Sequence, residues 1–293
     1  MKLGAISFMT DYSIAPSEFA RELEAHGYES FWAGDHTHIP VEGDPSATIL
    51  DSRTNLPLQP EYWHLMDPFV VLANAAAATS RILLGIGITL INERDPIVTA
   101  KQVASLDHLS GGRFLFGIGG GWNVAEMRNH GTDARFKWRI MRERVAAMRE
   151  IWTKDVAEFH GEFVDFTPLR SWPKPIQKPG PPILIGGNDR NIPRVVEYGD
   201  GWAPGVINLP TEVFTEQIVE LQRQAEAAGR GRLPVTAFHV TPVADLEVGS
   251  ALELTDRQWD AYERAGVDRV VVMFPPWRDR NLALVERLAR FAG

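Results

Sequence analysis

The sequence of 293 residues predicts an α/β fold, a closed (β/α)8 TIM barrel. Short apolar runs alternate with longer amphipathic stretches, and strictly repeated strand-then-helix order requires parallel strands joined by crossover helices. Eight such units in a chain of this length favour a closed barrel over a doubly wound open sheet, which is the alternative. We expect one domain over residues 1–293.

The expected strands and helices follow one another without a break in the alternation. Apolar runs predict strands at 2–9, 29–33, 81–88, 113–118, 182–185, 201–204, 234–240 and 268–274. Apolar residues at helical spacing predict helices at 16–26, 67–79, 96–109, 134–152, 190–198, 212–228, 256–265 and 279–291.

Local signals support several of these boundaries. Gly27 ends the first helix, and the pairs Asp67-Pro68 and Asp95-Pro96 each supply an N-cap followed by proline at the first helical position. In the helix over 134–152, we expect Arg142, Glu143 and Arg144 to form a solvated face. The side chains at 141, 145, 148 and 152 are expected to pack against the barrel.

Two connections are long enough to suggest binding loops or lids, namely 35–66 after the second strand and 154–181 before the fifth. The second is rich in proline, which predicts an extended path fixed by restricted backbone angles.

Composition excludes several function classes. The net charge is −8, from 30 basic and 38 acidic residues, which argues against general binding to nucleic acid or anionic membranes. The chain has no cysteine, so disulfides, thiolate nucleophiles and cysteine-ligated metals are excluded. No signal peptide and no uncharged apolar stretch of about 18 residues is present, so we expect a soluble, cytoplasmic protein.

In such a barrel the active site lies where the strands end and the βα loops begin. Two glycine clusters occur there: Gly119, Gly120 and Gly121 after the fourth strand, and Gly186 and Gly187 before Asn188 after the fifth. Glycine lets backbone N–H groups approach an anion, and a following helix N-terminus adds positive potential, so the two clusters together favour a phosphate site. Each cluster alone is better explained by a tight turn at the end of a strand.

The second strand ends at Asp35 and His36. Histidine titrates near neutrality and can pass a proton to or from a substrate, with the neighbouring carboxylate positioning it or contacting a cofactor. The His36-x-His38 spacing also permits zinc, and thus a metal-dependent hydrolase, but the fourth, fifth, sixth and eighth strand ends supply no further histidine.

Aromatic side chains near these ends are candidates for a substrate pocket. Trp63, Trp122 and Trp277 could stack on a flat ring, and with Tyr62 they favour an apolar or aromatic substrate.

Several of these segments resemble the luciferase-like monooxygenases and coenzyme F420-dependent oxidoreductases. The resemblance covers about residues 1–290, through Phe31-Trp32-Ala33-Gly34-Asp35-His36 and through Pro181-Pro182-Ile183-Leu184-Ile185-Gly186-Gly187. Its most specific part, 95–122, contains Leu106-Asp107-His108-Leu109-Ser110-Gly111-Gly112-Arg113 and Gly117-Ile118-Gly119-Gly120-Gly121-Trp122.

The resemblance implies a barrel, often dimeric, that binds F420 or FMN. It implies that His36 assists proton transfer beside the ring and that Gly87, Ile88 and Thr89 form a wall behind it, with a cis peptide at Gly87-Ile88. The loops holding Gly119 to Gly121 and Gly186 to Asn188 would contact the phosphate. Trp122 replaces a glutamate of the sugar-phosphate dehydrogenases, so that substrate class is not expected.

The leading hypothesis is therefore hydride transfer between F420 and a small organic substrate, with His36 and Asp35 as catalytic residues. The alternatives are an FMN-dependent monooxygenase supplied by a partner reductase and a catalytically silent flavin- or deazaflavin-binding protein.

Overall fold

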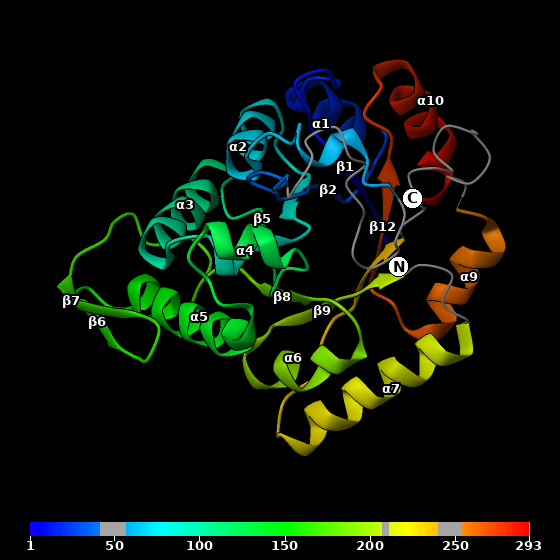
Figure 1. Cartoon of the computed structure of the whole chain (residues 1–293). Helices are drawn as coiled ribbons and strands as arrows, with labels where there is room; N and C mark the ends of the chain where they lie inside the picture. The colour runs from blue at the N-terminus through cyan, green and yellow to red at the C-terminus, as the bar shows by residue number, and fades with distance from the viewer. Residues whose placement is uncertain (42–56, 207–210, 240–253, 293) are drawn as a thin grey trace.

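The computed structural model describes residues 1–41, 57–206, 211–239 and 254–292 (Figure 1). Its central feature is a barrel of parallel strands. These are β1 (Lys2–Ser7), β2 (Ser30–Ala33), β3 (Leu83–Ile86) with its continuation β4 (Thr89–Leu90), β5 (Phe114–Gly119), β8 (Ile183–Gly186), β9 (Gly201–Ala203) with β10 (Gly205–Val206), β11 (Thr236–His239) and β12 (Arg269–Phe274).

The barrel closes through two sets of pairs. β12 lies beside β1 in parallel register. Between β9 and β11, the barrel is closed by pairing of β10 with β11 and by a parallel bridge between Trp202 of β9 and Val235. Pro204 separates β9 from β10, and its carbonyl accepts the N–H of Phe238 at 2.9 Å, so the interrupted strand still serves the barrel. The predicted (β/α)8 barrel is confirmed.

Helices surround the strands, as Figure 1 shows. They are α1 (Pro16–Ala25), α2 (Pro68–Ala78), α3 (Pro96–Leu109), α5 (Lys137–Thr153), α6 (Ile192–Tyr198), α7 (Thr211–Ala227), α9 (Asp256–Ala265) and α10 (Arg278–Leu288). The predicted caps are confirmed, because Asp67 accepts the N–H of Phe69 and Asp95 accepts the N–H groups of Ile97 and Val98.

Shorter elements lie between the predicted strands and helices. A short helix, α4 (Val124–Asn129), follows β5 where the sequence indicated a helix N-terminus, and a 3₁₀ turn that the sequence prediction missed, η2 (Ile91–Glu93), precedes α3. The connection over 154–181 is not extended throughout. It begins with an antiparallel hairpin of β6 (Ala157–His160) and β7 (Asp165–Leu169), which lies beside α5 (Figure 1).

This hairpin corrects the expectation of a solvated face on α5. Glu143 accepts the backbone N–H groups of Phe163 and Val164 in the hairpin. Arg144 is half-buried and donates to the carbonyl of Ile91 at 2.6 Å. Two of the three charged side chains therefore bind the loops that flank α5, and the third, Arg142, is exposed and pairs with Glu197.

The core has two layers. Between strands and helices lies a large apolar cluster that includes Met141, Val145, Met148 and Trp152, the face of α5 predicted to pack on the barrel. A smaller cluster fills the barrel interior around Trp32, whose indole occupies the space that a side chain at Gly85 would need. The barrel is a packed body with its free space at one end. Within the described ranges no helix is both long and apolar enough to cross a membrane.

Candidate active site

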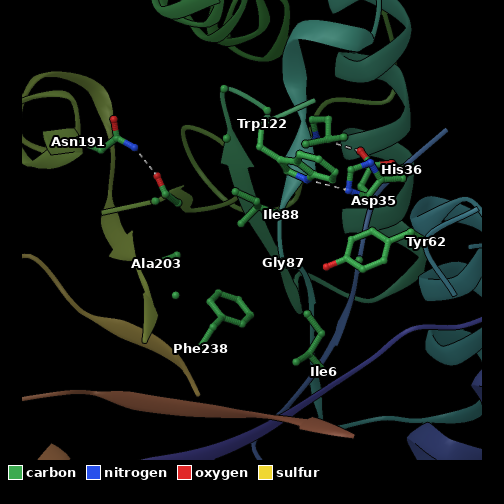
Figure 2. Close-up of a pocket in the computed structure, with 18 of the residues that line it drawn as sticks. Ile6, Asp35, His36, Tyr62, Gly87, Ile88, Trp122, Asn191, Ala203 and Phe238 are labelled. Atoms are coloured by element: carbon green, nitrogen blue, oxygen red, sulfur yellow. Dashed lines mark hydrogen bonds between the residues drawn. The ribbon is translucent and has the colours of Figure 1, made fainter. Parts of the chain in front are cut away.

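A cavity of about 350 Å³ lies at the carboxyl ends of the barrel strands. Such volumes are typical of sites for small molecules and cofactors. Both glycine clusters, Asp35, His36 and Trp122 line this one cavity, together with apolar side chains from the barrel interior (Figure 2). The two glycine clusters thus meet at one site, as the phosphate hypothesis requires.

Ile88 crosses the cavity floor and explains part of the glycine pattern. The Gly87-Ile88 peptide is cis, as the resemblance implied. The Ile88 side chain lies against β5 and β8, where a Cβ on either Gly119 or Gly186 would overlap its Cδ1. These two glycines are therefore needed for close packing beneath the cavity.

The remaining glycines shape the rim. Gly121 has φ +74° and Gly187 has φ +102°, backbone angles that side-chain-bearing residues rarely adopt. Asn191 lines the cavity and donates to the carbonyl of Gly186 at 2.8 Å, which closes the turn after β8. The tight turns that the glycine clusters suggested are present. They leave the cavity rim without side chains at Gly121 and Gly187.

Positive charge lies beside this rim. Trp138 of α5 lines the cavity. Arg194 stacks over its ring at 4.1 Å, and the Lys137 ammonium lies 5.0 Å from the same ring. Lys137 also donates to the Gly121 carbonyl at 3.0 Å. Burial and the neighbouring Arg194 lower the pKa of Lys137. Sequence analysis did not single out these three residues, because nothing in their spacing marks them.

His36 is held at both ring nitrogens. Its Nδ1 lies 2.7 Å from Oε2 of Glu126. Its Nε2 accepts the indole N–H of Trp122 at 3.3 Å, as Figure 2 shows. A carboxylate accepts and an indole N–H donates, so these partners select the tautomer with the proton on Nδ1 and a lone pair on Nε2. In this state the imidazole can accept a proton at Nε2.

Glu126 is the carboxylate that positions His36, and sequence analysis missed it. It is fully buried in α4 and also accepts the N–H groups of Thr37 and His38. Burial favours the neutral form, but the hydrogen bonds from His36 and these two N–H groups outweigh it and lower the pKa of Glu126. The available signal was Asn123, which caps α4 three positions before Glu126 and so fixes the helix at the rim.

Asp35 lines the same cavity but has other partners. Its Oδ1 accepts a hydrogen bond from Nη2 of Arg94 at 2.6 Å. Its Oδ2 accepts hydrogen bonds at 3.0 Å from Nε of Arg94 and from the backbone N–H of Leu90. Arg94 also reaches the N-cap Asp67 at 3.1 Å. Asp35 therefore ties β2 to the loop after β4, and positioning of His36 falls to Glu126.

Several predicted site residues lie outside the described lining of the cavity. Thr89 is buried in β4 beside Ile118, and Asn188 is exposed as the cap of the 3₁₀ turn η4 (Asp189–Asn191). Trp63 is 44% exposed. Trp277 caps α10 under Arg280. Tyr62, next to Trp63 in the 3₁₀ turn η1 (Pro60–Tyr62), turns toward the cavity and contacts His36 edge to face at 5.4 Å.

The imidazole rings of the two histidines in the His36-x-His38 spacing have separate partners. His38 lies 2.9 Å from Nδ2 of Asn129, while His36 binds Glu126. Among the residues that the structure describes, no group of three or more potential metal ligands comes together.

Comparisons with known proteins bear on this site. A family model described as luciferase-like monooxygenase matches residues 16–280. An uncharacterized protein of Mycobacterium tuberculosis is 40% identical over 249 residues, covering 84% of this chain and 86% of that protein. The FMNH(2)-dependent dimethylsulfone monooxygenase of Pseudomonas putida is 29% identical over 187 residues, covering 62% of this chain and 51% of its own.

Two solved structures share the fold at low sequence identity. Monooxygenase RslO1 from Streptomyces bottropensis has a TM-score of 0.74 at 19% identity, covering 99% of this chain and 98% of that one. An F420-dependent secondary alcohol dehydrogenase, solved with an F420-acetone adduct, has a TM-score of 0.73 at 15% identity and covers 99% and 97%.

Proposed function

Because the chain belongs to the luciferase-like monooxygenase family, we propose that it is an oxidoreductase that transfers hydride between coenzyme F420 and a small apolar or aromatic substrate. The observation that carries this proposal is the state of His36. Glu126 and Trp122 hold its imidazole with the proton on Nδ1 and the Nε2 lone pair at an otherwise largely apolar cavity, where a substrate hydroxyl would take the place of the Trp122 N–H. Hydride transfer to or from an alcohol carbon requires such a proton acceptor or donor at the adjoining oxygen.

The residues that line the cavity have different roles in this reaction. A bound deazaflavin supplies or accepts the hydride. His36 takes the hydroxyl proton of an alcohol at Nε2, or returns a proton to the carbonyl oxygen in the reverse direction. Ile88 supports the ring from below, and Phe238, Ile6 and Met273 exclude water from the reacting carbon.

The phosphate end of the cofactor would lie at the rim. Gly121 and Gly187 expose backbone there, and Lys137 with Arg194 supplies positive charge around Trp138. A phosphate interacts favourably with backbone N–H groups and cations together. This arrangement fits F420 and FMN equally, so it does not choose between them.

FMN is the second candidate, favoured by the similarity to a relative named as an FMNH(2)-dependent monooxygenase. In that case a partner reductase would supply reduced flavin, and oxygen would be the co-substrate. We further propose a homodimer, following the family resemblance.

Titration of the purified protein with F420 and with FMN separates the two. We expect F420 to quench tryptophan fluorescence at lower concentration than FMN. With F420 bound, His36→Asn should retain affinity and lose turnover of secondary alcohols by about a hundredfold or more. His38→Asn is the matched control, because His38 lies two residues away and does not line the cavity.

Two results would overturn the F420 assignment. One is tighter binding of FMN together with oxygen-dependent consumption of NAD(P)H in the presence of a reductase. The other is a His36→Asn variant that turns over every substrate at the wild-type rate, which would show that His36 takes no part in the reaction.

A further inference from the structure

Glu93 is a buried carboxyl group that the proposed chemistry does not yet use. It ends the 3₁₀ turn η2 and is 6% exposed. No N–H or O–H of the described residues donates to either of its oxygens. Its Oε1 lies directly behind the cavity rim, 3.4 Å from where a Cβ on Gly121 would stand. An ionised carboxylate without donors would be costly in such a place.

The carboxyl group next to Glu93 is that of Glu126, within hydrogen-bonding range. Two carboxyl groups in contact share a proton, because both cannot be ionised at low cost. Burial, followed by the charge of Glu126, raises the pKa of Glu93 to about 9. Since the pKa of Glu126 is lowered, Glu93 holds the shared proton at neutral pH.

Glu93 also lines a second cavity on the outer side of the barrel, which we call the outer cavity. It has a volume of about 420 Å³ and lies between η2, α5 and the β6–β7 hairpin. Its lining includes Asp95, His130 and Asp165, which are exposed, so the outer cavity reaches the protein surface. Arg144 contributes a half-buried guanidinium whose Nε has no partner in the described part of the chain.

The two cavities are thus joined by three titratable side chains. Glu93 lines the outer cavity and His36 lines the active-site cavity, and Glu126, which exposes no surface of its own, interacts with both of these side chains. We propose that Glu93 and Glu126 conduct protons between the outer cavity and His36. The route would serve the proposed hydride transfer when cofactor and substrate fill the active-site cavity and exclude water from it.

Each transfer on this route balances. When His36 takes a proton at Nε2, its Nδ1 proton passes to Glu126, Glu93 releases its own proton to water in the outer cavity, and Glu93 then takes the proton from Glu126. In the opposite half-reaction Glu93 first passes its proton to Glu126, Nε2 gives up its proton as Nδ1 takes the one on Glu126, and water then resupplies Glu93. The two halves together restore all three groups.

Other charged groups around the path set its electrostatics. Asp35 disfavours ionisation of Glu93, and Arg94 favours it. From α5, Arg144 faces Glu93 and Asp95. His130 lies near both His38 and Glu126, and its own pKa is lowered, first by burial and then by His38. Because Glu93 holds the proton, the Glu93–Glu126 pair carries one negative charge and not two beside the Asp35–Arg94 pair.

The first test needs no cofactor. Infrared spectra of the wild-type protein should show the carbonyl band of a protonated carboxylic acid at pH 7, and this band should disappear near pH 9. Glu93→Gln should lack the band. Glu61→Gln is the matched control, because Glu61 is also 6% exposed, has an oxygen without a donor, and lies away from the outer cavity. NMR signals of the His36 ring should follow the same titration in wild type and not in Glu93→Gln.

The second test measures turnover and rescue. Glu93→Gln should slow turnover by about a hundredfold and enlarge the solvent deuterium isotope effect, while substrate KM stays within twofold. In Glu93→Ala, formate should restore the rate because it fits the vacated space. The same acid should not restore Glu93→Gln, whose amide fills that space.

The outcomes separate this proposal from the proposed function. No acid band at pH 7 in wild type, or no response of His36 to the titration, would overturn the proton path whatever the cofactor. Turnover by Glu93→Gln at the wild-type rate would overturn it as well. If the band and the His36 response appear but neither F420 nor FMN supports turnover, the path is supported and the assigned reaction is wrong.

Discussion

The buried proton on Glu93 should be visible in the stability of the protein. In the unfolded chain its carboxyl has the ordinary value of 4.5, and in the folded protein its pKa is about 9. Between these values the folded state holds a proton that the unfolded state has released. Below pH 4.5 the carboxyl group is protonated in both states. As pH rises from 4.5 to about 9, the unfolded state loses this proton before the folded state does, so the free energy of unfolding falls.

The size of the effect follows from linkage. One extra proton bound by the folded state changes the free energy of unfolding by about 1.4 kcal/mol per pH unit. From pH 6 to pH 8, both inside the window, Glu93 alone should lower the free energy of unfolding by about 2.7 kcal/mol. Glutamine resembles protonated glutamic acid in shape and can donate to Glu126, so Glu93→Gln should cost little at pH 6.

Urea unfolding followed by tryptophan fluorescence measures this difference, since the chain has nine tryptophans. For each protein we take the change in the free energy of unfolding between pH 6 and pH 8. The value for Glu93→Gln is then subtracted from the value for wild type. Other titrating groups are common to both proteins and cancel. Equal pH dependence in the two proteins would show that Glu93 is already ionised at pH 6, and the argument for a shared proton would be refuted.

Three further substitutions test other parts of the site. Gly186→Ala should cost about 1–3 kcal/mol in urea unfolding, because its Cβ overlaps Cδ1 of Ile88, and adding Ile88→Val should recover part of the loss. Lys137→Met should weaken binding of the phosphate-bearing cofactor about tenfold and flatten its dependence on salt, measured by fluorescence titration. Trp122→Phe keeps an aromatic ring but removes the N–H donated to His36, so kcat/KM should fall about tenfold while cofactor affinity changes little.

The barrel was predictable from the sequence because its signals are local and repeated. Apolar runs, Asp-Pro helix starts and the helix stop at Gly27 depend on neighbouring residues alone, and the structure places these elements within a few residues of their predicted bounds. The β6–β7 hairpin was missed because the prolines that follow it in the same connection predicted an extended path for the whole segment.

The candidate site was predictable only in part. Position at the ends of β2 and β5 was sufficient to find His36 and the glycines, because every strand end of a parallel barrel reaches the same rim. Partner choice was not predictable. Asp35 precedes His36 in the chain, yet the carboxylate that binds His36 is Glu126, 90 residues away. Both side chains line the cavity, and each binds a partner that only the folded loops bring to it.

The different partners of Asp35 and His36 determine how the chemistry is arranged. Asp35 binds Arg94 and becomes part of the rigid frame, while His36 takes its carboxylate from α4. The glutamate pair therefore stands behind His36 and away from the ring. A ring that transfers hydride needs a dry, apolar face, and proton exchange needs water. With the carboxyl groups behind the imidazole, one histidine can meet both requirements, since its Nε2 faces the dry cavity and its Nδ1 faces the route to the wet one.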